Sequence, residues 1–185
     1  MDQVVHVFLQ FTIGIFLTIN ISIMCILFAQ SRQTVLQGME PLPDVGRDLL
    51  VNTPQWFTDV SLFGIVLLTA WFKCIPSIRY FRNVCYVYIL RAIVIAVTTY
   101  PPLHIPLYGS TADLLFSGHT VAFWAIADLL DAKLGYSMWR SFVLRFIAPL
   151  SLISSRQHYT SDVIVAASIM FLLPGRRDCL WVNVE

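Results

Sequence analysis

Long apolar stretches separated by short polar connections dominate the chain. A helix that crosses the ~30 Å hydrocarbon core of a bilayer needs about 20 apolar residues. We therefore predict six membrane-spanning helices, at Val7–Ala29, Trp56–Pro76, Asn83–Tyr100, Leu114–Leu130, Ser141–Ser155 and His158–Leu173. The last three are shorter and more polar, so a soluble hairpin made of the fourth and fifth segments stays open as a second interpretation. The first segment is longer than the core of a secretion signal, which is about 7–15 residues, and we expect it to span the membrane.

The composition agrees with a chain that is largely immersed in lipid. Hydrophobic residues make up 57% of its 185 residues and charged residues 12%, against about 45–50% and about 25% in soluble domains. We expect an all-α membrane protein in which residues 1–185 form a single six-helix bundle, with the functional motifs within residues 41–165. The net charge of +1 offers no basic surface for nucleic acid. The four cysteines lack metal-ligand spacing and are expected to be small apolar side chains in the protein interior.

Basic residues in the connections predict how the six helices are oriented. With six spans, the side that holds both termini carries Lys73, Arg79, Arg82, Lys133, Arg140, Arg176 and Arg177. The opposite side carries Arg32, Arg47 and Arg156. Because cytosolic connections carry the excess of Lys and Arg, we expect both termini in the cytosol. The 101–113 connection and the turn at residues 155–160 then face the lumen or the exterior.

Polar residues at the start of the sixth segment are suited to catalysis. His158 and Asp162 are four residues apart, so a helical conformation would place them in contact on one face. A carboxylate in that position fixes the imidazole tautomer and leaves the second ring nitrogen able to attack. The alternative is a pair that merely satisfies itself at a helix entry. We favour a functional pair because ionisable residues are costly in or beside a membrane.

A second histidine lies in the sequence Ser117-Gly118-His119-Thr120, at the start of the fourth segment. Glycine lets a ligand approach the backbone closely, and the first amides of a helix favour an anion. The imidazole can serve there as a general acid or base. For His119 alone, a structural histidine that donates to a neighbouring helix is the alternative. The predicted orientation, however, places His119 and His158 at the same membrane face, which favours one catalytic site.

The side chains of His119, His158 and Asp162 together suit in-line phosphoryl transfer. One histidine attacks phosphorus and forms a covalent intermediate. The other protonates the departing oxygen and later deprotonates the incoming one. This chemistry needs no metal or other cofactor. A zinc site built from the same three side chains is conceivable, but it would leave no nucleophile among them.

Three further polar residues are candidates for substrate binding. Arg156 precedes His158 and is a planar cation suited to phosphate oxygens. Arg91 lies in the middle of the third segment, where we expect it to face inward and pair with a carboxylate or a lipid phosphate. Asp113, six residues before His119, is expected to orient His119, to bind a cationic head group or to cap the fourth helix. The sequence does not separate these three roles.

The two histidine motifs, Phe116-Ser-Gly-His-Thr-Val121 and His158-Tyr-Thr-Ser-Asp-Val-Ile-Val165, resemble the signature motifs of the sphingomyelin synthase family. Weaker similarity covers Pro41-Leu-Pro-Asp44 followed by Asp48, and the stretch from Arg91 to Pro101. The resemblance implies six spanning helices and catalysis on the exoplasmic side. It also implies that His158 is the nucleophile, that Asp162 orients it and that His119 assists the leaving and incoming oxygens. Where this chain has Thr111-Ala112-Asp113, the family commonly has Cys-Gly-Asp, which leaves head group and acceptor open.

The resemblance further implies an enzyme that transfers phosphocholine from phosphatidylcholine to ceramide, giving sphingomyelin and diacylglycerol through a phosphohistidine. Transfer to diacylglycerol, transfer of phosphoethanolamine, and a lipid phosphate phosphatase that uses water as acceptor stay open. A membrane protein that only binds ceramide would not require His119, His158 and Asp162 together. We expect a multi-pass protein of the Golgi or plasma membrane if the source is eukaryotic, with a lumenal or exoplasmic active site. The sequence is compatible with a homo-oligomer.

Overall fold

The computed structural model describes residues 2–33, 43–98, 116–174 and 179–180. Within these ranges every regular element is a helix, so the predicted all-α fold is confirmed for this part of the chain. In chain order the elements are α1 (Asp2–Gln33), α2 (Val45–Leu49), α3 (Gln55–Trp71), α4 (Ile78–Val97), α5 (Gly118–Leu134), α6 (Met138–Phe142), the π-helical turn η2 (Val143–Ile147), α7 (Ala148–Ser154) and α8 (Thr160–Leu172). Because α6, η2 and α7 follow one another without a break, they form one long helical segment.

Each predicted span corresponds to one long helical segment, but the helix ends differ from the prediction. α3 ends at Trp71 rather than at Pro76. α4 begins at Ile78, five residues before the predicted start at Asn83, and the Ser77 side chain caps it by accepting a hydrogen bond from the Tyr80 N–H. Hydropathy therefore locates the segments, whereas local hydrogen bonds of capping residues set their ends.

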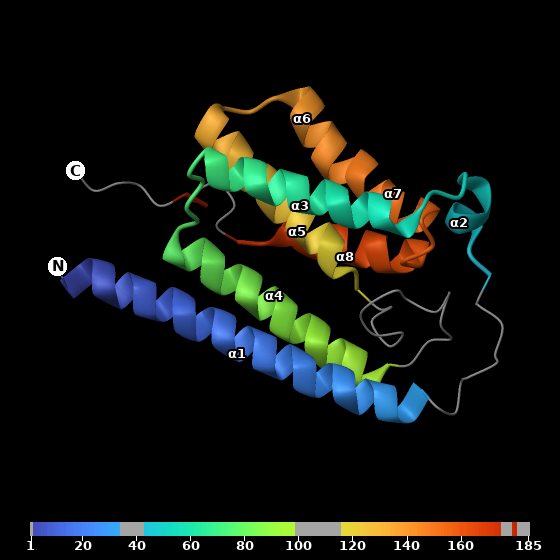
Figure 1. Cartoon of the computed structure of the whole chain (residues 1–185), viewed down its shortest axis with the longest axis horizontal. Helices are drawn as coiled ribbons and strands as arrows, with labels where there is room; N and C mark the ends of the chain where they lie inside the picture. The colour runs from blue at the N-terminus through green and yellow to red at the C-terminus, as the bar shows by residue number, and fades with distance from the viewer. Residues whose placement is uncertain (1, 34–42, 99–115, 175–178, 181–185) are drawn as a thin grey trace.

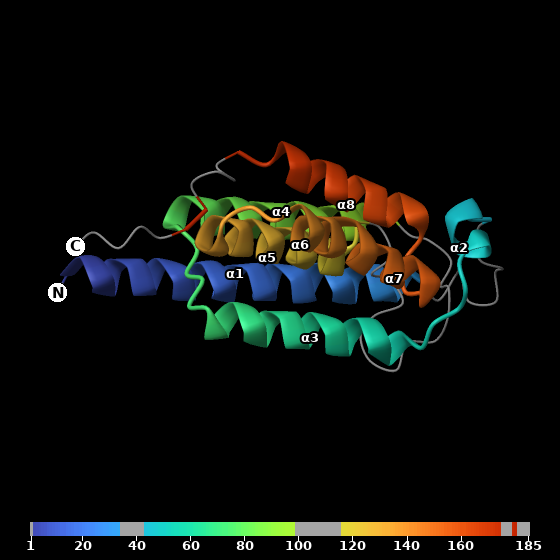
Figure 2. The ribbon, with the colours of Figure 1, turned by 90° about the horizontal axis from the view of Figure 1, so that it is seen from above.

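Helix α5 lies in the middle of the bundle. It packs against α3, α4, α7 and α8, while α1 lies along α4 at one side (Figures 1 and 2). Buried residues occur on every side of α5 between Thr120 and Leu130, as expected for a helix surrounded by protein. This central position places the fourth segment inside the bundle. Whether the fourth and fifth segments span the membrane or form a soluble hairpin stays a prediction.

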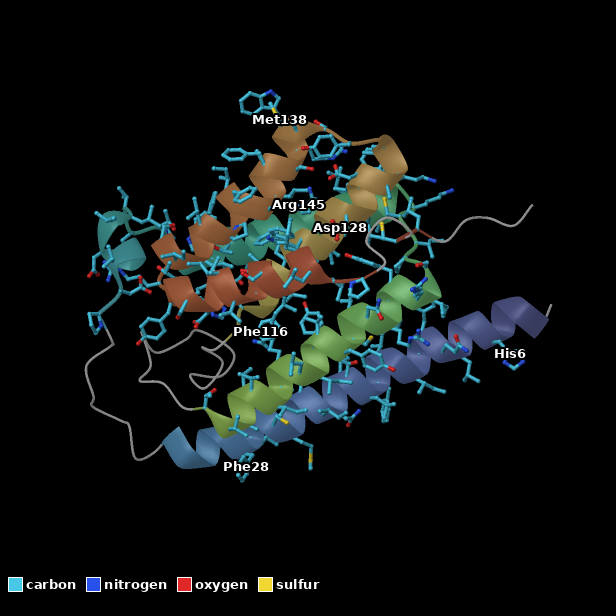
Figure 3. The ribbon with its side chains drawn as sticks, turned by 180° about the vertical axis from the view of Figure 1, so that it is seen from behind. His6, Phe28, Phe116, Asp128, Met138 and Arg145 are labelled. Atoms are coloured by element: carbon cyan, nitrogen blue, oxygen red, sulfur yellow. The ribbon has the colours of Figure 1, made fainter. Side chains whose placement is uncertain are left out.

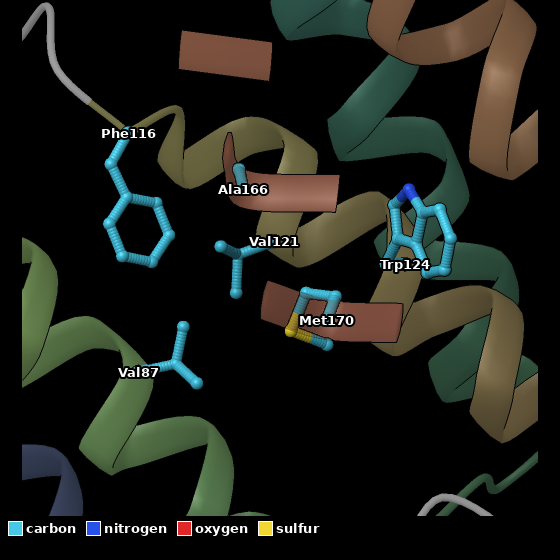
Figure 4. Close-up of a cluster of buried hydrophobic side chains, with 6 residues drawn as sticks. All are labelled: Val87, Phe116, Val121, Trp124, Ala166 and Met170. Atoms are coloured by element: carbon cyan, nitrogen blue, oxygen red, sulfur yellow. The ribbon is translucent and has the colours of Figure 1, made fainter. Parts of the chain in front are cut away.

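A buried apolar cluster holds together the helices that begin near the two histidine motifs. Figure 4 shows its members, which come from α4, from the turn before α5, from α5 itself and from α8: Val87, Phe116, Val121, Trp124, Ala166 and Met170. Packing of this kind leaves few voids and transmits small displacements between the elements. The positions at which α5 and α8 begin are therefore fixed relative to each other.

A network of charged side chains lies farther along α5, away from His119. Arg145 of η2 lies 2.7 Å from an Asp128 oxygen and 3.0 Å from an Asp131 oxygen, and Arg140 lies 2.8 Å from Asp131. The Tyr80 hydroxyl donates to Asp128 at 2.9 Å. Asp128 and Arg145 meet between the helices in Figure 3. The network ties α4, α5 and η2 together, and it was not predicted from the sequence.

The outer surface of the bundle is rich in large apolar side chains. On α3, for example, Trp56, Phe63 and Trp71 are 59%, 64% and 82% exposed. By length and composition, α4 is the one helix among the described residues that is long and apolar enough to cross a membrane. Shorter apolar stretches occur at Leu9–Cys25, Trp56–Trp71 and Thr160–Leu172.

Several of the basic connections lie toward one end of the bundle. The end of α3, the start of α4 and the end of α5 lie toward the end of the bundle that also holds the start of α1 (Figure 1). Lys73, Arg79, Arg82 and Lys133 belong to these ends and connections, whereas α6, which carries Arg140, begins nearer the middle of the bundle (Figures 1 and 2). The starts of α3, α5 and α8 lie at the opposite end (Figure 1). Which end faces the cytosol stays a prediction.

Candidate active site

His119 occupies the first turn of α5, as predicted. Ser117 is the N-cap, and its side chain accepts a hydrogen bond from the Thr120 N–H at 3.2 Å. The preceding residue, Phe116, has a φ of 74°, a left-handed conformation that is strained for a residue with a large side chain. Its ring is buried in the apolar cluster, and its carbonyl accepts a hydrogen bond from Arg91 Nε at 2.8 Å. These contacts hold the strained turn in place.

Arg91 packs directly against this turn. Its side chain is buried inside the bundle, which confirms that it faces inward. A Cβ atom on Gly118 would lie 3.1 Å from both Cζ and Nε of Arg91 and 3.4 Å from Nη2. Because only glycine leaves this space open, Gly118 permits the guanidinium to lie beside the turn that carries His119. The Tyr88 hydroxyl donates to the Gly118 carbonyl at 3.0 Å and fixes the same turn from α4.

Asp59, in the second turn of α3, is the partner of His119. Its Oδ1 lies 3.1 Å from His119 Nε2, and its Oδ2 accepts a hydrogen bond from Gln157 Nε2 at 3.4 Å. Asp59 thus links the histidine of α5 to the turn that carries His158. A carboxylate in this position orients an imidazole and stabilises its protonated form.

The start of α3 is itself held against the end of α7 by hydroxyl groups. The Thr58 side chain is completely buried, and its hydroxyl lies 3.2 Å from the Ser151 hydroxyl and 3.4 Å from that of Ser155. The Thr53 hydroxyl lies 2.8 Å from that of Ser154. These contacts set the position of Asp59, next to Thr58, relative to the turn that follows α7.

His158 lies in the turn between α7 and α8, one residue before the N-cap Tyr159. Its side chain is only 6% exposed, and Nδ1 lies 3.5 Å from Oδ2 of Asp162, whose side chain is 1% exposed. The same Oδ2 accepts the Tyr159 N–H at 3.0 Å. The predicted contact between His158 and Asp162 is confirmed. The reason given for it is wrong, because His158 precedes α8 and the contact arises from a tight turn rather than from helical spacing.

The contact between His158 and Asp162 is longer than a good hydrogen bond. The distance of 3.5 Å between Nδ1 and Oδ2 exceeds the usual donor–acceptor distance of about 2.7–3.2 Å. Nδ1 of His158 is buried without a hydrogen bond to the described residues. Hydrogen bonds of catalytic groups are often long in a free enzyme and shorten when substrate binds. A small rotation of the buried ring would complete the bond and leave Nε2 to react.

The two histidines face each other across the end of the bundle. Their ring centroids are 6.2 Å apart and the ring planes are inclined by 63°. Each ring has a carboxylate beside it, Asp59 for His119 and Asp162 for His158. The backbone also joins the two motifs, because the Ser117 N–H donates to the Asp162 carbonyl at 3.3 Å. The structure therefore brings His119, His158 and Asp162 into one site, as predicted.

Asp44 fixes the start of α8 from the opposite side. Its two carboxylate oxygens accept hydrogen bonds from the Thr160 N–H at 2.6 Å and the Thr160 hydroxyl at 2.5 Å. A Cβ atom on Gly46 would lie 2.2 Å from the Thr160 hydroxyl oxygen, so glycine is required for α2 to approach this closely. A carboxylate at a helix N-terminus is also favoured by the helix dipole. Asp44 thus supports the turn that presents His158.

The remaining predicted site residues lie in different surroundings. Arg156 is exposed and has a φ of 57°. Its backbone N–H donates to the Ile153 carbonyl at 3.1 Å, but its guanidinium makes no hydrogen bond or ion pair with the described residues. Asp113 falls outside the described residues, so its three proposed roles stay open. Among the residues that the structure describes, no group of three or more His, Cys, Asp or Glu side chains is arranged to hold a metal ion.

Asp59 and Gln157 were not predicted from the sequence as residues of the site. A signal for Asp59 was present, because an ionisable residue at the start of an apolar segment is costly and points to function. Gln157 carried no comparable signal. The partner of Asp59 lies 60 residues farther along the chain, and no local pattern indicates it.

Neutralising Asp59 is expected to reduce the activity of this site without unfolding the bundle. In Asp59→Asn the side chain still forms a hydrogen bond but no longer stabilises a protonated His119, so kcat should fall about 10²–10⁴-fold with little change in KM. Asp59→Glu should recover part of the loss. Ser61→Ala, two residues along on α3 where the hydroxyl donates to the Phe57 carbonyl, is the control. An Asp59→Asn protein with the wild-type kcat would show that the contact with His119 is only structural.

Comparison with known proteins gives one family match and several relatives. Residues 111–174, which include both histidine motifs, match the family described as PAP2 superfamily C-terminal. Phosphatidylcholine:ceramide cholinephosphotransferase 1 of Gallus gallus is 26% identical over 195 residues, which cover 82% of this chain and 46% of the relative. The Homo sapiens protein of the same name is 27% identical over 170 residues, which cover 68% of this chain and 41% of the relative.

A relative with a different name is similar to the same extent. Phosphatidylinositol:ceramide inositolphosphotransferase of Trypanosoma cruzi is 24% identical over 234 residues, which cover 85% of this chain and 70% of the relative. The chain thus spans less than half the length of the two cholinephosphotransferases and about two thirds of the length of the inositolphosphotransferase.

Proposed function

Because residues 111–174 match the PAP2 superfamily C-terminal family and most of the chain resembles the sphingomyelin synthases, we propose that this protein is a lipid head-group phosphotransferase embedded in a membrane. The observation that carries the proposal is the pair of facing imidazole rings, 6.2 Å apart, each beside a carboxylate. Two rings at this separation can contact one phosphoryl group. This is the requirement for splitting phosphoryl transfer into an attack and a protonation.

In the first half-reaction, His158 Nε2 attacks the phosphorus of the donor phosphodiester. A P–N bond forms as the P–O bond to the diacylglycerol breaks, and His119 gives its proton to the departing oxygen. Asp162 holds His158 by Nδ1 and stabilises the positive charge that develops on the ring. Asp59 stabilises the protonated His119 before it donates. The products are diacylglycerol and a phosphohistidine that carries the head group.

In the second half-reaction, the hydroxyl of the acceptor lipid takes the place of diacylglycerol. Neutral His119 removes the hydroxyl proton while the oxygen attacks phosphorus, and the P–N bond to His158 breaks. Both histidines return to their starting protonation states, so one site serves both steps. Arg91, beside the first turn of α5, supplies positive charge near the phosphoryl oxygens.

We propose phosphatidylcholine as the donor and ceramide as the acceptor. The names of the Gallus gallus and Homo sapiens relatives, which specify phosphatidylcholine and ceramide, support this choice. The Trypanosoma cruzi relative, at similar identity, is named for phosphatidylinositol instead. An assay must therefore offer several head groups, with diacylglycerol and water as competing acceptors.

The membrane arrangement belongs to the same proposal. The six long helical segments would span the bilayer with both termini in the cytosol and the histidine site on the lumenal or exoplasmic side. Three features support it: the exposed apolar side chains, the shared end of several basic connections and the length and composition of α4. A glycosylation acceptor inserted in the 101–113 connection should be modified, and one inserted near residue 135 should not. Modification of only the second would invert the orientation.

One reconstitution experiment tests the reaction. Purified protein is placed in vesicles with phosphatidylcholine labelled in its phosphocholine group, together with ceramide, diacylglycerol or neither. Label in sphingomyelin is expected. Label exchanged into diacylglycerol alone would change the acceptor, and water-soluble label would indicate a phosphatase. No movement of label from choline, ethanolamine or inositol phospholipids would contradict a head-group transferase.

A further inference from the structure

An apolar groove of about 430 Å³ runs between α1 and α4. Ligand pockets in proteins are typically about 300–1,000 Å³. On α1 the groove is lined between Ile15 and Ile23 by residues at helical spacing, so one face of this helix forms its wall. On α4 the lining residues also follow one face, and they are Phe81, Val84, Cys85, Tyr88 and Arg91.

The groove ends at the catalytic turn. Arg91, the one charged residue of its lining, donates to the Phe116 carbonyl and packs against Gly118, next to His119. Tyr88, from the same wall, donates to the Gly118 carbonyl. The apolar part of the groove therefore leads along α4 to a cation at the site of phosphoryl transfer.

We propose that this groove holds one acyl chain of the phospholipid donor, with the donor's phosphate at the Arg91 end. From Phe81 to Arg91 the α4 wall is about 15 Å long at the rise of an α-helix, which suits much of a long acyl chain. Thr18 on the α1 wall needs no hydrogen-bond partner from the ligand, because its hydroxyl already donates to the Gly14 carbonyl. A cation at the end favours a phosphodiester over a neutral acceptor, which has no charge to offer it.

The inference rests on the proposed function, and a kinetic experiment separates the two. Ser22→Phe places a large ring in the groove near Arg91. With dipalmitoyl-phosphatidylcholine as donor, its KM should rise at least about tenfold, because each methylene kept out of the groove weakens binding. With dihexanoyl-phosphatidylcholine, whose chains are too short to fill the groove, kcat and KM should stay near the wild-type values. Asn20→Phe, on the same helix but outside the groove, is the matched control.

Equal losses with both donors, or an unchanged KM for the long-chain donor, would overturn the groove as an acyl-chain site. Wild-type protein that transfers neither donor would instead contradict the proposed function.

A binding measurement decides the inference without catalysis. Phosphatidylcholine with a diazirine in the middle of one chain is cross-linked to the protein in micelles, and the labelled residues are identified by mass spectrometry. We expect saturable labelling of the 15–23 and 81–91 segments that unlabelled phosphatidylcholine displaces, diacylglycerol displaces poorly, and Ser22→Phe reduces at least about fivefold. Labelling that does not saturate, or that Ser22→Phe leaves unchanged, would show only annular lipid and overturn the proposal.

Discussion

Replacing His158 with alanine is expected to abolish head-group transfer. The side chain is buried in the turn before α8, beside Asp162 and opposite His119. No other described nucleophile has this arrangement, so the residual rate should be at least about 10⁴-fold lower than that of wild type. Because we propose that the intermediate is a phosphohistidine at this residue, the variant should also fail to acquire label from phosphocholine-labelled donor when the acceptor is left out and the protein is quenched at alkaline pH.

The control for this substitution is His6→Ala. His6 is exposed near the start of α1, at the far end of the bundle from the site (Figure 3), and its loss should leave both transfer and labelling unchanged. His119→Ala provides a second comparison. It should slow transfer strongly yet still permit some labelled intermediate, because it loses the proton donor and keeps the nucleophile. Wild-type labelling of His158→Ala would remove His158 as the nucleophile.

The positions of the helical segments along the chain were largely predictable from hydrophobicity. Apolar side chains cluster in six stretches because each stretch must lie in lipid or in the bundle core. The sequence shows these stretches directly as runs of hydrophobic residues. Helix ends were less predictable, since capping depends on single hydrogen bonds such as that between Ser77 and the Tyr80 N–H. The turn before α5 is held by Arg91, which is remote in sequence. The start of α5 was therefore predicted at Leu114, four residues before its position at Gly118.

The candidate site was predictable to the extent that its residues form local motifs. His119, and His158 with Asp162, were identified because ionisable residues beside apolar segments are costly. Asp59 and Asp44 depend on pairings with residues 60 and 116 positions away, which only the folded chain reveals. The far network of Asp128, Asp131, Arg140 and Arg145 was missed for a related reason, because its two carboxylates and two guanidinium groups become one neutral unit only after the helices pack.

Neutralising Asp162 is expected to remove most of the activity while leaving the fold intact. Asp162 has two tasks: its Oδ2 caps α8 by accepting the Tyr159 N–H, and the same atom lies 3.5 Å from His158 Nδ1. In Asp162→Asn an amide oxygen can still accept the N–H, so the cap is retained. The charge that stabilises a positively charged His158 ring is lost, and kcat should fall about 10³–10⁴-fold.

The two tasks separate in a pair of variants. Asp162→Asn should elute as a monodisperse protein with a thermal midpoint close to wild type, because it keeps the cap. Asp162→Ala should lose the cap as well, which costs about 0.5–2 kcal/mol of stability, and its midpoint should fall below that of Asp162→Asn. Both should be almost inactive. If Asp162→Asn transfers at the wild-type rate, the carboxylate serves only the helix, and the orientation of His158 must come from the turn itself.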